Sequence, residues 1–175
     1  HGPMMKARSK FGGTGTVKMR QMIRQATKDP EVRTILLHVD SPGGHVAGTQ
    51  ELADEVFRAR ESGKPLLAHI DDLCASAAYW VASQALSITA NPIAEIGSIG
   101  TIAVLEDHSA AMEKLGITVH IITTGAFKGI GVKGAPVTDE VLAYLQDRVD
   151  SLNTHFLVAR GRGRKKSAQQ LVPWS

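Results

Sequence analysis

Ser76 stands at a position where a serine hydroxyl can act as a nucleophile. It lies in the run Cys74-Ala-Ser-Ala-Ala-Tyr-Trp80, in which small residues surround one hydroxyl at the start of a short apolar helix expected over residues 76–83. A strand-to-helix turn exposes such a serine to substrate, and the helix N–H groups point at the reacting centre. The N–H of Ala77 would then be an oxyanion donor. The competing interpretation is a serine that only caps the helix.

Lys128 is the candidate general base for that serine. It lies in a Gly-rich loop, and Lys133 close by is its obvious competitor. A free lysine has a pKa of about 10.4 and is charged at neutral pH, so it accepts a proton only after burial among apolar groups has favoured the neutral form. Phe127, Ile130 and Val132 are the apolar residues that we expect to line such a pocket. A solvated loop lysine with no catalytic role is the alternative.

A glycine turn, Asp40-Ser-Pro-Gly-Gly44, follows a predicted buried strand and precedes a predicted helix. Two glycines let the backbone turn sharply and bring bare N–H groups close to a substrate. N–H groups at a helix start also favour negative charge, which is what stabilises an oxyanion. Gly43 or Gly44 is therefore the predicted partner of Ala77 in an oxyanion hole, although the same residues also make an ordinary turn.

Strand and helix patterns alternate along the chain, which favours an α/β domain with parallel sheet character. Apolar, β-rich runs predict strands at 34–39, 65–70, 86–89, 99–105 and 117–123. Apolar residues at helical spacing predict helices at about 19–29, 46–62, 76–83 and 112–115, and a last helix that begins at Thr138. With 175 residues the chain fits one domain, 1–175, with neither a linker nor an internal repeat.

The composition argues against several other classes of protein. The single cysteine, Cys74, rules out an intrachain disulfide and a zinc site built on paired cysteines, and its expected role is that of a small buried side chain. A net charge of +3 is too small to imply nucleic acid. Basic residues gather between Arg160 and Lys166, and we expect residues 160–175 to form a solvated, partly mobile tail. No apolar stretch is long enough to span a membrane.

Four motifs in this order resemble the signal peptide peptidase A family of serine peptidases, and the related phage head-maturation peptidases match equally well. The motifs are Asp40-Ser-Pro-Gly-Gly44, Ala75-Ser-Ala-Ala-Tyr-Trp80, Ile96-Gly-Ser-Ile-Gly100 and Gly125-Ala-Phe-Lys128. The resemblance runs from about Gly2 to about Arg164. One departure is that the family often has two glycines after the nucleophile, where this chain has Ala77 and Ala78. The added methyl groups narrow the site but keep the N–H groups.

The resemblance implies a ClpP/crotonase-like α/β fold, a spiral of ββα units that assembles into rings. It implies a serine endopeptidase that acts through an acyl-enzyme, with Ser76 as nucleophile and Lys128 as base, and with neither a metal ion nor a cofactor. Signal peptides, membrane-derived peptides and phage capsid or scaffold proteins are the expected substrates. The expected assembly is a homo-oligomeric ring whose protomers can share sites. The expected location is the cytoplasm, a membrane reached through a segment outside this chain, or a phage prohead.

The oxyanion donors and one supporting residue follow from the same resemblance. It implies Gly43 or Gly44, with Ala77, at the oxyanion hole. Ser98 matches a family position that hydrogen-bonds the lysine, and a turn serine is its simpler interpretation. Three alternatives stay open: His108 as a ClpP-like base, a crotonase-type acyl-CoA enzyme of the same fold, and a non-catalytic ring component.

Overall fold

The chain divides into two compact units. The computed structural model describes residues 2–7 and 14–165. The first unit comprises residues 1–100 and 153–175, and the second comprises residues 101–152. The last helix, α5 (Asp139–Arg164), begins in the second unit and ends in the first. That residues 1–175 fold as one domain stays a prediction.

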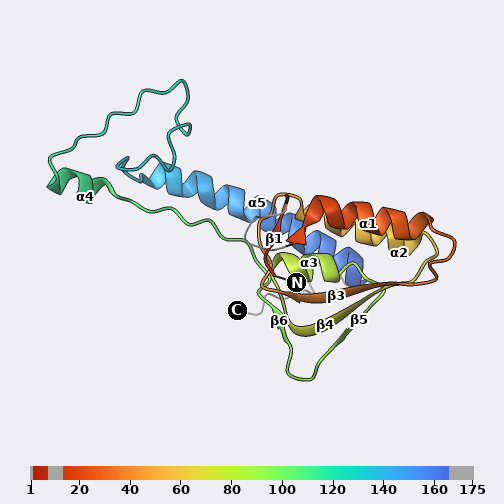
Figure 1. Ribbon diagram of the computed structural model, residues 1–175. Coiled ribbons are helices and arrows are strands. Elements are labelled where there is room, and N and C mark those ends of the chain that lie inside the picture. Colours follow the sequence, from red (N-terminus) through yellow and green to blue (C-terminus); the bar gives the residue numbers. More distant parts are fainter. Residues whose placement is uncertain (1, 8–13, 166–175) are drawn as a thin grey trace. The chain divides into compact units, whose positions relative to one another are not determined.

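The first unit is built on a four-stranded sheet in which every pairing is parallel (Figure 1). β4 (Leu66–Ala75) is its central strand and pairs with β3 (Ile35–Ser41) along one edge. Along the other edge β4 pairs with β5 (Ser87–Ala90) and then, further along the chain, with β6 (Glu95–Gly97). The predicted α/β class with a parallel sheet is confirmed.

Helices α1 (Thr16–Lys28), α2 (Thr49–Glu61) and α3 (Ala77–Ala82) cover one face of this sheet (Figure 1). A separate two-stranded parallel ladder joins β1 (Met4–Met5) to β2 (Thr14–Gly15). The helices present their apolar sides to the sheet, and the buried core is drawn from both layers. Burial of these apolar surfaces is the main term that holds the unit together.

Side chains along β3 and β4 alternate between the two faces of the sheet, as the period of a strand requires. Leu37, Ala68 and Ile70 are buried on the helix-covered face. His38 and His69 are register partners that occupy the intervening positions, and they therefore lie on the other face. One face of the sheet thus belongs to the core, while the other presents the two histidines together with Leu36, which is 60% exposed.

The second unit contains α4 (Ser109–Lys114) and the start of α5, and its described residues form no strand. The predicted strands at 99–105 and 117–123 are therefore wrong for this structure. Their β-rich composition is real, but a strand exists only where a second backbone completes its ladder. Without that ladder Ile102 and Ile122 are 88% and 97% exposed.

The predicted mobile tail is wrong for residues 160–165, because the first five of these continue α5 and the sixth forms the turn after it. Arg162 donates to the side-chain oxygen of Gln84 through Nε at 3.1 Å and Nη2 at 2.9 Å. Arg164 Nε donates to the carbonyl oxygen of Ser83 at 2.9 Å. Carbonyls at a helix end lack intrahelical donors, and Arg164 supplies one to Ser83, the residue that caps α3. The rest of the predicted tail lies outside the described residues.

Candidate active site

Ser76 occupies the sharp turn that joins β4 to α3. Its backbone has φ 52° and ψ −123°, outside the regions that non-glycine residues ordinarily adopt. Such a conformation costs on the order of 1–3 kcal/mol and persists only where the surroundings impose it. Here Ser76 N donates to Gly97 O at 2.9 Å, and Trp80 N donates to Ser76 O at 3.0 Å. Those two bonds fix the backbone on both sides of a half-buried hydroxyl.

Gly43 packs directly against the serine turn. A Cβ atom added to Gly43 would lie 2.8 Å from Ser76 Cβ, 2.7 Å from Ala75 O and 2.9 Å from Ala77 N, and the φ of Gly43 is +97°. Contacts this short leave no room for a side chain, so only glycine fits. The glycine turn and the start of α3 therefore meet at Ser76, as the predicted oxyanion hole requires.

The hydrogen bonds of the glycine turn distinguish its two N–H groups. Gly43 N donates to Ser41 Oγ at 3.2 Å, and Ser41 Oγ itself donates to Gly2 O at 2.7 Å. Within the described residues the N–H of Gly44 has no recorded acceptor. The N–H of Ala77, in the first turn of α3, belongs to the set that has no acceptor within its own helix.

Ser98 follows the last residue of β6, beside the serine turn. The register pairs Ala75 with Gly97, so the next positions along the two strands are Ser76 and Ser98. Ser98 is exposed and has φ 51°, almost the same unusual value as Ser76. The structure thus brings five predicted site residues into one corner of the first unit: Gly43, Gly44, Ser76, Ala77 and Ser98.

Lys128 belongs to the second unit, where its side chain is exposed and its backbone N–H donates to Gly125 O at 3.2 Å. The three apolar residues predicted to surround it do line a cavity of about 300 Å³, but Lys128 is not among the lining residues. The second unit alone therefore leaves this lysine solvated. The pairing of Lys128 with Ser76 stays a prediction, as does His108, which contacts Glu106 Oε2 through Nε2 at 2.8 Å.

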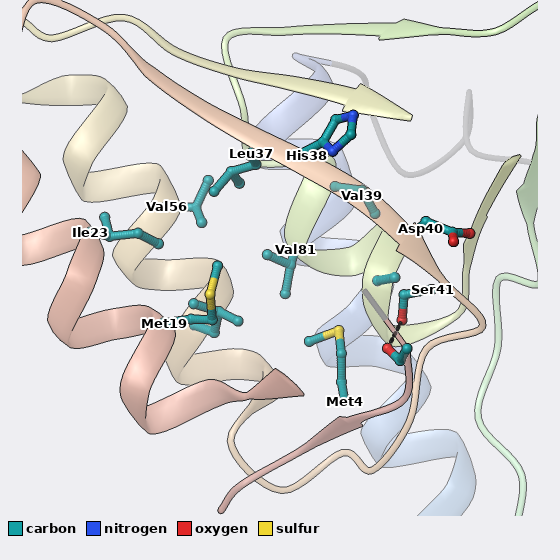
Figure 2. A pocket seen from close by; sticks show the side chains of 13 residues that line it. Met4, Met19, Ile23, Leu37, His38, Val39, Asp40, Ser41, Val56 and Val81 are labelled. Carbon is teal, nitrogen blue, oxygen red and sulfur yellow. Dashed lines mark hydrogen bonds between the residues drawn. The ribbon is translucent and has the colours of Figure 1, made fainter. Parts of the chain in front are cut away.

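An apolar cavity of about 180 Å³ lies between the sheet and its helices (Figure 2). Figure 2 shows Met4, Met19, Val56 and Val81 pointing into it from β1, α1, α2 and α3. Ser41, whose Oγ holds Gly43 N, also lines this cavity. The cavity therefore borders the turn that carries the predicted oxyanion donors.

Cys74 is buried two residues before Ser76, and burial raises the pKa of its thiol to about 12. A thiol with so high a pKa is not a nucleophile at neutral pH. The expected role of this cysteine as a small buried side chain is confirmed.

Sequence reasoning missed one cluster. His38, His69 and Asp71 come from two neighbouring strands, and their ligand atoms lie within 4.8 Å of one another. Alternation along each strand could have found them, because it puts His38 on one face of β3 and puts His69 and Asp71 together on one face of β4. The sequence alone does not give the register that sets β3 beside β4.

Comparison with known proteins identifies the family. Residues 58–175 match the model of peptidase family S49. Capsid assembly protease C of Escherichia phage lambda is 36% identical over 145 residues, which cover 83% of this chain and 33% of the relative. A putative protease of Methanocaldococcus jannaschii is 37% identical over 130 residues, covering 74% and 42%. Protease 4 of Salmonella typhi is 28% identical over 171 residues, covering 98% and 28%.

The chain thus spans about a third of the length of these curated relatives. Among solved structures, a membrane-bound stomatin-specific protease matches with a TM-score of 0.45 at 13% identity, over 92% of this chain and 65% of that one. In the described residues no helix is both long and apolar enough to cross a membrane. The resemblance carried by the four motifs is confirmed by the family match, and the chain belongs to peptidase family S49.

Proposed function

We propose that this chain is the core of a serine endopeptidase that hydrolyses peptide bonds through a Ser76–Lys128 dyad. The observation that carries the proposal is the strained Ser76, pressed against Gly43 at the start of α3. A purely capping serine has no need of an unfavourable φ. A nucleophile does, because the turn lifts its hydroxyl out of the sheet toward substrate.

The oxyanion donors in this proposal are the N–H groups of Gly44 and Ala77. The bond from Gly43 N to Ser41 Oγ supports Gly44 over Gly43, since a donor already engaged must exchange its partner to serve an oxyanion. Ser98, at the neighbouring strand position, has the proposed role of a hydrogen-bond partner for the amine of Lys128. Donors held ready in this way stabilise the charge that develops in the transition state.

The proposed reaction is acyl transfer in two steps. The neutral amine of Lys128 takes the hydroxyl proton of Ser76 while Oγ bonds to the peptide carbonyl carbon. Collapse of the tetrahedral intermediate breaks the C–N bond, and the lysine returns its proton to the leaving amine. Lys128 then accepts a proton from water, whose oxygen attacks the acyl-enzyme carbonyl. Collapse breaks the ester C–O bond, and the lysine returns the proton to Ser76 Oγ as the carboxylic acid leaves.

Lys128 can act in this way only if groups outside the second unit cover it, since a solvated lysine stays charged. Apolar side chains of the same unit are also exposed, among them Val104 at 82% and Leu115 at 72%. We therefore include in the proposal a homo-oligomeric ring, in which one contact repeats around a cyclic axis and neighbouring protomers can share a site.

The proposed substrates are signal peptides and other membrane-derived peptides, or phage capsid and scaffold proteins. The first kind is suggested by a relative described as a putative signal peptide peptidase of Enterococcus faecium, 28% identical over 148 residues. The second is suggested by the lambda capsid assembly protease. The first kind fits a site near a membrane, and the second fits a phage prohead.

Covalent labelling tests the nucleophile. A fluorophosphonate should label the wild-type chain at Ser76 and leave Ser76→Ala unlabelled but folded. Lys128→Ala should lose labelling and peptide hydrolysis to the same extent, because members of one catalytic unit do not lose rate additively. Lys133→Ala and His108→Ala are matched controls that should keep most activity. Loss of activity in His108→Ala together with full activity in Lys128→Ala would replace the dyad with a histidine mechanism.

A further inference from the structure

Two histidines and an aspartate gather on the face of the sheet that points away from the helices. His38 on β3 and His69 on β4 are direct register partners, and Asp71 is the next residue along β4 on the same face. His38 is exposed, and in Figure 2 its ring points away from Met4, Val56 and Val81. The three side chains therefore stand apart from both the core and the turn that holds the serine.

The distances within this cluster are short enough for the three side chains to contact one ion. Asp71 Oδ1 lies 2.8 Å from His38 Nε2 and 3.8 Å from His69 Nε2. The two imidazole rings are stacked, with centroids 5.8 Å apart and planes 9° from parallel. Both Nε2 atoms thus approach the same carboxylate oxygen from one side of the sheet.

Thr89 lies beside the second ring nitrogen of His69. Its Oγ1 donates to Ala68 O at 3.4 Å, and it lies 2.9 Å from His69 Nδ1. The Nε2 atom of the same ring is the nitrogen that faces Asp71 Oδ1. A metal ion bound at Nε2 would leave Nδ1 as an N–H donor, and Thr89 Oγ1 lies within hydrogen-bond distance to accept from it.

We infer that His38, His69 and Asp71 form a binding site for a divalent transition metal ion, with Zn²⁺ as the expected ligand. Two imidazole nitrogens and one carboxylate are a common zinc donor set, and water fills the remaining position. Bonds of about 2.0–2.1 Å in a tetrahedron put ligand atoms roughly 3.3 Å apart. The 2.8 and 3.8 Å separations from Asp71 Oδ1 lie on either side of that value, and all three ligand atoms lie within 4.8 Å of one another.

The hydrogen bond to Thr89 adds the outer-shell partner that zinc-bound histidines usually have. A histidine ligand almost always donates its second ring N–H to a neighbouring acceptor, which fixes the ring and its tautomer. Losing such a partner weakens metal binding about 10- to 100-fold. A substitution of Thr89 therefore tests the metal site while leaving all three proposed ligands in place.

The experiment is calorimetric titration of the metal-free chain with ZnCl₂, together with Co²⁺ absorption as a probe of coordination. We expect one site per chain that is lost in His69→Gln and in Asp71→Asn. Thr89→Val should bind about 10- to 100-fold more weakly. His120→Gln and His155→Gln, which alter exposed histidines elsewhere, are the matched controls and should bind as the wild type does.

Thermal unfolding of each metal-free variant shows whether it is folded, and exposure of His38 makes His38→Gln a second variant that should fold normally. Zn²⁺ should raise the unfolding temperature of the wild type but not of His38→Gln, because a ligand stabilises only the state that binds it. Equal binding by the wild type and by folded His69→Gln would overturn the inference. Equal binding by Thr89→Val would overturn the role given to Thr89.

Discussion

Replacing Gly43 by alanine should separate the position of the serine from the stability of the fold. The new Cβ would meet Ser76 Cβ at 2.8 Å, whereas ordinary contact begins at 3.4 Å, so the two turns must separate by about 0.6 Å. Gly63 is the matched control. Its φ of +93° is close to the +97° of Gly43, but a Cβ added there meets nothing within 4 Å.

The two substitutions therefore share one cost and differ in another. A side chain at positive φ costs on the order of 1–3 kcal/mol, and both variants should lose that much stability. Overpacking adds about 1–3 kcal/mol at Gly43 alone. Misplacing a reacting group by about 1 Å can lower a rate about 100-fold. Gly43→Ala should accordingly lose one to two orders of magnitude in peptide hydrolysis, while Gly63→Ala should lose none.

Urea unfolding measures the stability of each variant, and peptide turnover per folded chain measures its activity. Fluorophosphonate labelling provides a second readout of Ser76 that does not depend on the choice of substrate. If Gly43→Ala hydrolyses peptides as fast as Gly63→Ala, the contact between the glycine turn and the serine is not part of the catalytic geometry. The argument from strain at Ser76 would then fail as well.

Three further outcomes can be measured. Gly163→Ala should strongly lower the free energy of unfolding, because the new Cβ would collide with the Ser83 carbonyl oxygen. Gly100→Ala is the control: its Cβ meets no atom within 4 Å, so its urea unfolding should nearly match that of the wild type. Hydrogen bonds from Ser109 and Val137 lower the pKa of Asp107 from 3.8 to about 2. The stabilisation from these hydrogen bonds is therefore complete above pH 3.8 and is lost as the pH falls toward 2, so urea unfolding should show stability falling more steeply across that range in the wild type than in Asp107→Asn. Cys74, with its thiol pKa raised to about 12, should resist thiol reagents at pH 8 until the chain is unfolded.

Local sequence patterns predicted most elements of the first unit closely. The run 86–89 became β5 (Ser87–Ala90), and the segment 76–83 became α3 (Ala77–Ala82). The end of β5 is marked in the sequence by Asn91-Pro92, a pair that ends a strand locally. β6 was missed because three residues make a strand only when β4 supplies the partner backbone.

Contacts between distant residues were the part that local patterns could not predict. A run of basic residues is normally solvated, yet Arg162 finds an acceptor in Gln84, 78 positions away in the sequence. The motif around Gly43 and Gly44 predicted an oxyanion turn but could not rank its two N–H groups. That ranking depends on where the Ser41 hydroxyl lies, and only the folded structure gives it.

The two halves of the proposed dyad are therefore under different physical control. Ser76 takes its position from the chain that immediately surrounds it: a parallel strand before it, a helix after it and Gly43 pressed against it. Lys128 is exposed in the second unit, and its chemistry needs a covering surface. The placement of the serine should hence survive any change in assembly that leaves the first unit folded, whereas the base strength of the lysine should respond to assembly. A chain dispersed by dilution would keep a well-placed hydroxyl and lose the neutral amine, so hydrolysis should fall before the fold does.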